Sequence, residues 1–355
     1  MPTEFVTLLR SEVKCRDCLL GQSIPHGQEP SERFALPVKS FAVGSPQERI
    51  TFQLVKADEI GRPSMWKVLF WALRLPLLTL SWTPVVAVWV WLWAGGYEFK
   101  AQDLFLVLGN LFLLHMGVFL LNDYWDHMRG VDRLSSRRGS QVIQRGWLRA
   151  WQVRLWGWAA LVTGGLLGTG ILLWSRASLE LWVLVFGAAF AVLILAWSPR
   201  KLRRWALTEL LILLSLGPLL TCGSMMFWLG SCSPEIGALG LGFGVLALLS
   251  FHLRSLGALL SEKSLLGRLG FDLSHRLLSV EIALLPVFFA FVFWALGEFR
   301  LGLVLGALVL FVGLKLLQLL VQSRSSLSSS LRPLRAWALL MHFSVGVGVA
   351  LVALM

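Results

Sequence analysis

Charged side chains are scarce in this chain. Only 15% of its 355 residues are Asp, Glu, Lys or Arg, whereas 56% are hydrophobic. A water-soluble protein of this length needs far more polar surface, so the composition excludes a soluble globular protein. The composition instead predicts a polytopic membrane protein that contacts the lipid bilayer.

The long hydrophobic runs also lack a regular alternation of apolar and polar residues. Strands of a membrane-spanning barrel alternate in this way, whereas the runs here are continuous and roughly 20 residues long, which indicates helices. We therefore predict an all-α integral membrane protein with nine transmembrane helices. The nine spans are expected at residues 69–94, 103–121, 152–174, 179–197, 206–229, 236–253, 278–297, 301–321 and 335–355.

Cysteine is rare as well. The four cysteines are too few and too scattered to form a disulfide framework. Cys15 and Cys18 form a single CxxC with His26 nearby, but a zinc site needs a fourth ligand and a redox site needs a βαβ context. The sequence therefore assigns no role to these two cysteines.

Acidic residues are fewer than basic ones, and the net charge is +12. Most of the basic residues lie in the loops after the second, fourth, sixth and eighth spans. Examples are Arg129, Arg133, Arg200, Arg203, Arg254, Lys263, Arg324 and Arg332. By the positive-inside rule, these loops and the N-terminus are cytoplasmic and the C-terminus lies outside. We therefore expect a multi-pass protein of a bacterial-type inner membrane and no nucleic-acid partner.

The chain divides near residue 62. Residues 1–62 form a mixed polar cytoplasmic segment of unknown fold, with weak alternation between Ile50 and Val55. They either fold as a small appendage or lie on the membrane. Residues 63–355 hold all nine expected spans, and the chain ends in or just after the last of them, so we expect no soluble C-terminal domain.

A cluster of polar residues directly follows the second hydrophobic run. If the helix continues through residue 126, Asn122 and Asp126 lie one turn apart on one face, and Asp123 is offset by roughly 100°. Gly130 permits a turn that brings Asp132 back towards them. Hard oxygen ligands suit Mg²⁺ bound together with substrate phosphates. Alternatively, the aspartates face water at a solvated helix end and pair with nearby arginines.

The cluster belongs to a longer pattern that comprises Asn122-Asp123-x-x-Asp126, Gly130-x-Asp132, Arg137-x-Gly139-Ser140 and Gln144-x-Gly146. This pattern resembles the first signature of the UbiA superfamily of intramembrane prenyltransferases. Its form is most similar to the 1,4-dihydroxy-2-naphthoate polyprenyltransferase branch. Further positions resemble the same family, namely Arg74, Pro76, Thr79, Pro84, Ser198-Pro199-x-Lys201-Leu202, Glu209, Gly217-Pro218 and Gly223.

The resemblance covers about residues 62–355. It implies a nine-helix UbiA-like bundle with an active-site cap on the cytoplasmic side. It also implies transfer of a polyprenyl group from a prenyl diphosphate to an aromatic or quinone-precursor acceptor, with Mg²⁺ assisting ionisation of the diphosphate.

The resemblance also implies roles for individual residues. The expected metal ligands are Asn122, Asp123, Asp126 and Asp132; the expected catalytic residues are Asp123, Asp126, Lys201 and Arg254; the expected substrate-binding residues are Asn122, Arg137, Arg74 and Glu262. Arg137 and Lys201 also fit cations that only set the topology. His127 either contacts the acceptor or faces water.

The chain departs from the family in the second acidic motif, which is expected in the loop after the sixth span. The corresponding stretch runs from His252 to Lys263. Arg254 is retained, but leucine, glycine and alanine stand where aspartates are expected. Only Glu262 remains in the loop, so the second motif is degenerate.

Three readings of this departure stay open. In the first, the enzyme works with one well-held metal, while Arg254, Lys263 or His252 holds the rest of the diphosphate charge. In the second, the protein binds a lipid diphosphate without turnover or acts as an accessory subunit. In the third, it has lost this ligand, which the intact first motif argues against. A transporter is disfavoured because paired broken helices in two halves are not evident.

Overall fold

The structure is a computed structural model. It describes residues 4–9, 33–41, 49–56, 63–98, 100–128, 139–143, 145, 147–175, 178–197, 207–256, 265–323 and 331–355. Cys15 and Cys18 lie outside these residues.

The N-terminal segment contains a three-stranded antiparallel sheet. Its strands are β1 (Glu4–Leu9), β2 (Arg33–Phe41) and β3 (Arg49–Lys56), in the order β1-β3-β2. The alternating stretch between Ile50 and Val55 lies in the central strand. Thr7 and Thr51 face each other across β1 and β3, with 3.0 Å between their hydroxyl oxygens. Pro37 lies on the edge strand β2, where proline is tolerated, and the register with β3 shifts between Pro37 and Lys39.

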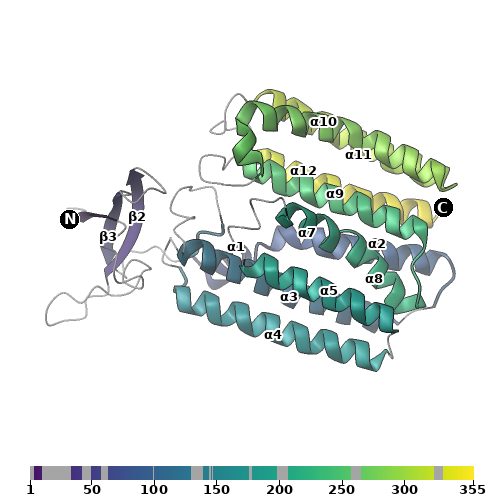
Figure 1. The fold of residues 1–355 in the computed structure, drawn as a ribbon, viewed down its shortest axis with the longest axis horizontal. Helices are drawn as coiled ribbons and strands as arrows, with labels where there is room; N and C mark the ends of the chain where they lie inside the picture. Colours follow the sequence, from purple (N-terminus) through teal and green to yellow (C-terminus); the bar gives the residue numbers. More distant parts are fainter. Residues whose placement is uncertain are drawn as a thin grey trace. The chain divides into compact units, whose positions relative to one another are not determined.

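Most of the remaining described residues are helical (Figure 1). The helices are α1 (Met65–Ala72), the 3-10 turn η3 (Leu75–Leu78), α2 (Thr79–Ala94), α3 (Ala101–Met128), α4 (Ala150–Trp174), α5 (Leu179–Trp197), α7 (Leu207–Ser215), α8 (Pro218–Leu229), α9 (Pro234–Leu256), α10 (Leu265–Ala295), α11 (Phe299–Val321) and α12 (Leu331–Ala353). Among the described residues, nine segments are long and apolar enough to cross a membrane, which confirms the predicted number of spans.

Two of the nine spans begin away from their predicted positions. The first begins at Leu75 instead of residue 69, because the chain leaves the helical conformation after α1. The seventh begins at Leu269 instead of residue 278. The additional residues include Asp272 and Arg276, which are both exposed on the first turns of α10. Gly270 kinks α10 there, with φ 76°.

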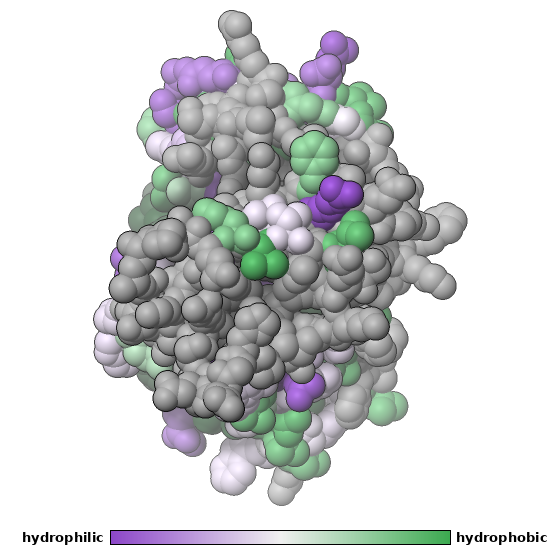
Figure 2. Space-filling view, turned by 90° about the vertical axis from the view of Figure 1, so that its left-hand side faces the viewer, coloured by the Kyte–Doolittle hydropathy of each residue, from purple (hydrophilic) through white to green (hydrophobic). Residues whose placement is uncertain are grey.

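The described residues form two compact units. The first comprises Met1–Leu75 and Met116–Leu161, and the second comprises Pro76–His115 and Val162–Met355. In the second unit, α9, α10, α11 and α12 pack side by side, and α2 packs against α12 and α8 (Figure 1). Phe243, Phe289 and Phe293 are fully buried in the core of this unit. On the face shown in Figure 2, hydrophilic and hydrophobic residues are interspersed among those that are coloured.

The fifth span is broken into α7 and α8 at Gly217, and glycines let α9 approach this break. A Cβ atom on Gly240 would lie 2.8 Å from Pro218 Cα, and one on Gly217 would lie 2.8 Å from Gly244 Cα. Small residues of this kind allow helix backbones in membranes to pack closely. The close contact therefore requires glycine at these positions, because a side chain would overlap the neighbouring backbone.

A disulfide joins Cys222 in α8 to Cys232 in the short connection to α9. The Cα atoms are 5.2 Å apart, and the two residues are ten positions apart in the sequence. It is a single local bridge rather than a framework, and the cysteine count had not revealed it.

We predict that Gly240→Ala lowers the free energy of unfolding by about 1–3 kcal/mol, because the new methyl group overlaps the backbone at Pro218. Gly237→Ala is the matched control on the same helix, since its Cβ would meet only Cys222 Sγ at 3.9 Å. Alanine favours the helix by about 1 kcal/mol, so this control should be neutral or stabilising. Denaturant titration of the protein in detergent measures both, and equal effects would contradict the close packing.

Candidate functional site

The polar cluster lies at the C-terminal end of α3, in the first unit. The helix continues through Met128, so the predicted helical placement of Asn122, Asp123 and Asp126 is confirmed. Glycines on α3 and α4 bring these two helices together just before the cluster. A Cβ on Gly117 would lie 3.0 Å from Gly157 O. The close contact fixes the end of α3 against α4.

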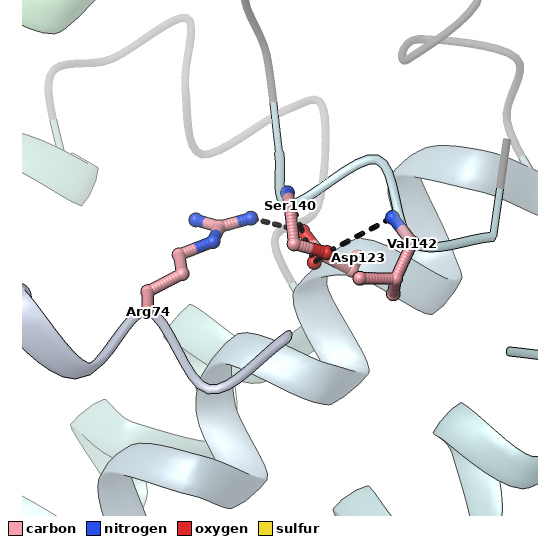
Figure 3. Close-up of polar contacts among 4 residues, drawn as sticks. All are labelled: Arg74, Asp123, Ser140 and Val142. Atoms are coloured by element: carbon pink, nitrogen blue, oxygen red, sulfur yellow. Dashed lines mark hydrogen bonds and ion pairs between the residues drawn. The ribbon is translucent and has the colours of Figure 1, made fainter. Parts of the chain in front are cut away.

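Asp123 is the centre of a buried hydrogen-bond network (Figure 3). The side chain of Arg74 donates from Nη2 to Asp123 Oδ1 and forms an ion pair with it. The Ser140 hydroxyl donates to Asp123 Oδ2, and the Ser140 backbone N–H donates to the same oxygen at 3.2 Å. Asp123 as a whole is 3% exposed. The sequence alternative of an aspartate that faces water is therefore wrong for Asp123.

Arg74 reaches Asp123 from a strained backbone position. Helix α1 ends at Ala72, and the Arg74 N–H donates to Trp71 O at 3.2 Å. Arg74 has φ 50°, in the left-handed region where helix ends normally use glycine. A non-glycine residue there costs on the order of 1–3 kcal/mol, and such strain concentrates at functional sites. The chain thus keeps a guanidinium where glycine would fit better.

Two donors of the Arg74 guanidinium have no acceptor in the part of the chain that the structure describes. Its side chain is only 9% exposed, and its Nε and Nη1 atoms are buried without a hydrogen-bond partner among the described residues. The guanidinium carbon lies 4.8 Å from the centre of the Phe119 ring, which can supply a cation–π contact. Buried donors that lack an acceptor are costly, so this arginine is suited to bind an anion.

Asn122 and Asp126 lie beside this network on α3, and both are half-buried. Asn122 Oδ1 is buried and has no hydrogen-bond partner among the described residues, so it offers an unused oxygen acceptor. His127 is only 2% exposed, so it does not face water.

The other expected site residues are placed less completely. Arg254 is half-buried in the last turn of α9, in the second unit. The helix dipole stabilises a cation at this end of the helix. The residues that lie outside the described part of the chain are Asp132, Arg137, Lys201 and Glu262.

The structure shows two polar partners that the sequence patterns did not identify. Ser140 belongs to the Arg137-x-Gly139-Ser140 pattern, and its place there is the sequence signal that could have identified it as a partner of Asp123. Glu281 on α10 pairs with His252 on α9, with 3.4 Å between Glu281 Oε2 and His252 Nδ1. No spacing rule links these two residues, which are 29 positions apart.

Comparison with known structures identifies proteins with the same fold. A UbiA homologue from Archaeoglobus fulgidus, solved with DMAPP and Mg²⁺ and also with GPP and Mg²⁺, matches with a TM-score of 0.57 and 16% identity. In both cases the match covers 80% of this chain and 99% of the homologue. Digeranylgeranylglyceryl phosphate synthase matches with a TM-score of 0.52 and 13% identity, over 81% of this chain and 98% of that protein.

These similarities confirm the predicted fold class, an all-α membrane protein with a UbiA-like bundle. No protein-family model matches the chain, and neither does any curated protein sequence. At these identities, the likeness to solved structures concerns the fold alone.

We predict that Arg74→Met lowers the free energy of unfolding by about 3–5 kcal/mol, because it leaves the buried Asp123 carboxylate without its counter-charge. Asp123→Asn in the same protein should recover part of the loss, since it removes that charge. Arg145→Met is the matched control, because Arg145 is exposed and its guanidinium carbon lies over the Trp147 ring at 4.8 Å. Unfolding in detergent measures all three variants, and similar losses for Arg74→Met and Arg145→Met would contradict this reading.

Proposed function

We propose that this protein transfers a prenyl group from a prenyl diphosphate to an acceptor inside the membrane. The observation that carries the proposal is the set of unmet hydrogen-bonding groups around Asp123. Asn122 Oδ1 lacks a donor, while Arg74 Nε and Nη1 lack an acceptor among the described residues. A metal diphosphate meets both needs, since the metal accepts an oxygen ligand and the diphosphate accepts hydrogen bonds.

The oxygen donors of the cluster fit Mg²⁺. Asn122, Asp123 and Asp126 supply only amide and carboxylate oxygens, which are hard ligands. Both Asp123 oxygens accept hydrogen bonds, but a carboxylate has about four lone-pair sites, so acceptor capacity remains. Bound there, Mg²⁺ would neutralise charge on the departing diphosphate. Asp132 is the fourth proposed ligand.

The protein's own groups perform the remaining tasks. Arg74 donates to the diphosphate while its ion pair holds the Asp123 carboxylate in place. Ser140 holds the other Asp123 oxygen, so the carboxylate cannot rotate away. The apolar helices keep water away from the allylic carbocation until the acceptor attacks. The proposed roles of the remaining residues are diphosphate contact for Arg137, Lys201 and Arg254, and substrate binding for Glu262.

The likeness in fold supports this assignment, because the UbiA homologue from Archaeoglobus fulgidus has been solved with DMAPP and Mg²⁺ and with GPP and Mg²⁺. Within the superfamily, the Gly130-x-Asp132 spacing favours the 1,4-dihydroxy-2-naphthoate branch. We therefore propose an aromatic or quinone-precursor acceptor, and a role in quinone biosynthesis.

The proposed orientation places the N-terminus in the cytoplasm and the C-terminus outside, in a bacterial-type inner membrane. The disulfide supports it, because Cys222 and Cys232 lie near the α8–α9 connection and disulfides persist in oxidising compartments. Helix α9, with 23 residues, spans roughly 34 Å and separates this connection from the basic end at Arg254. The disulfide and the basic end thus indicate opposite sides of the membrane.

We predict that Asp126→Asn abolishes prenyl transfer, because it removes a charged metal ligand. The measurement is transfer of label from a radiolabelled prenyl diphosphate to aromatic acceptors by purified protein in lipid vesicles with Mg²⁺. Asp103→Asn is the matched control, since Asp103 lies in the first turn of the same helix, at its other end. This control should keep full activity.

The same experiment separates enzyme from binding protein. Transfer by the wild type that Asp126→Asn abolishes supports the proposed enzyme. Binding of the diphosphate at every Mg²⁺ concentration without turnover would instead identify a non-catalytic lipid-diphosphate binder or accessory subunit, which the degenerate second motif favours.

The orientation has its own test in oriented membrane vesicles. We predict that a membrane-impermeant maleimide modifies Cys222 and Cys232 only after reduction, and only from the outer face. Cys15 and Cys18 serve as the internal control and should react only in inverted vesicles. Reaction of both cysteine pairs from the same face would refute the proposed orientation.

A further inference from the structure

The guanidinium of Arg74 is paired with a carboxylate that the proposed function assigns to the metal. Nη2 of Arg74 donates to Asp123 Oδ1, while the hydroxyl and backbone N–H of Ser140 donate to Asp123 Oδ2. The side chains of Arg74 and Asp123 are only 9% and 4% exposed. Charges that are shielded from water interact more strongly than exposed ones. The protein itself therefore compensates the charge of Asp123.

This pairing works against a metal ion that arrives alone. The affinity of an oxygen-ligand site for a divalent cation depends on how many negative charges its ligands carry. Arg74 cancels the charge of one proposed ligand, Asp123. A guanidinium also repels a second cation that shares its carboxylate. We therefore expect a metal ion by itself to bind weakly here, because no added anion offsets the positive charge.

The same guanidinium has donors left for such an anion. Nε and Nη1 of Arg74 are buried and have no hydrogen-bond partner among the described residues. One end of the guanidinium points toward Asp123 and the other points away from it (Figure 3). The Phe119 ring contacts the guanidinium, with 4.8 Å from its centre to Arg74 Cζ. Phosphate oxygens accept charge-assisted hydrogen bonds from arginine, so a diphosphate can use the remaining donors.

We infer that Arg74 couples the binding of the metal ion to the binding of the diphosphate, so that the site takes its substrate as a metal–prenyl diphosphate complex. The inference rests on the proposed prenyl transfer. Without a diphosphate, Arg74 opposes the metal ion. With a diphosphate bound, Arg74 bridges it to Asp123, and the added negative charge removes the repulsion. Such coupling is reciprocal, so each ligand raises the affinity for the other by the same factor.

Binding measurements on the full-length protein in lipid nanodiscs test the coupling, with Mn²⁺ and inorganic pyrophosphate as probes. Electron paramagnetic resonance measures the binding of Mn²⁺ alone. Binding of radiolabelled pyrophosphate is measured without metal and with saturating Mn²⁺, and free concentrations are corrected for the complex that forms in solution. In the wild type, each probe should raise the affinity for the other by about 5–150-fold.

Removal of the Arg74 charge has an effect that a purely structural residue would not produce. Arg74→Gln should bind Mn²⁺ alone more tightly than the wild type, by about 5–150-fold, and should lose the coupling to pyrophosphate. A distorted site would instead bind Mn²⁺ less tightly. Arg145→Gln is the matched control, because Arg145 is exposed and contacts the Trp147 ring. This control should change neither affinity.

A double variant keeps the test decisive if the unpaired Asp123 carboxylate unfolds Arg74→Gln. Arg74→Gln with Asp123→Asn removes both charges of the buried pair, so its net charge is unchanged. This variant should bind Mn²⁺ alone about as the wild type does, and it should also lack the coupling. Thermal unfolding midpoints show which variants are folded.

The possible failures are distinguishable. A wild type that binds Mn²⁺ equally well with and without pyrophosphate would refute the coupling, while the proposed metal–diphosphate site stands. Full coupling in the double variant would exclude Arg74 as its source. Weaker binding of Mn²⁺ alone by folded Arg74→Gln would contradict the repulsion. No pyrophosphate binding by the wild type at any Mn²⁺ concentration would refute the proposed function, and the role of Arg74 with it.

Discussion

The buried ion pair between Arg74 and Asp123 organises the region where we propose the chemistry. A buried carboxylate must be paired, and Arg74 pairs it from the turn after α1 while Ser140 holds its second oxygen. Three segments that are separate in the sequence thereby meet at one side chain. Asn122 and Asp126 flank Asp123 on α3, so the ion pair also sets the position of these oxygen donors.

In this network both Asp123 oxygens accept hydrogen bonds, whereas neighbouring polar atoms have no partner among the described residues. Proteins normally give buried polar groups a partner, so the atoms of Arg74 and Asn122 that lack one among the described residues mark where a ligand is needed. The α8–α9 contact shows the opposite case, because its glycines serve only close packing. Buried polar atoms without partners therefore indicate a binding region, whereas closely packed glycines indicate a structural contact, and this distinction needs no comparison with other proteins.

The amino-acid sequence by itself determined the number of spans and the helical course of the polar cluster. In lipid every backbone polar group needs an internal hydrogen-bond partner, and a helix satisfies all of them within a single long apolar run. Hydropathy did not locate the starts of the first and seventh spans. The first span starts after the left-handed backbone conformation of Arg74, and the seventh starts in turns of α10 that carry polar residues. Both starts are set by local backbone conformation, which average hydropathy does not report. Only the tertiary structure decided the partners, such as Arg74 for Asp123, Glu281 for His252 and Cys232 for Cys222. Their pairing depends on how helices pack, and packing joins residues that no sequence period relates.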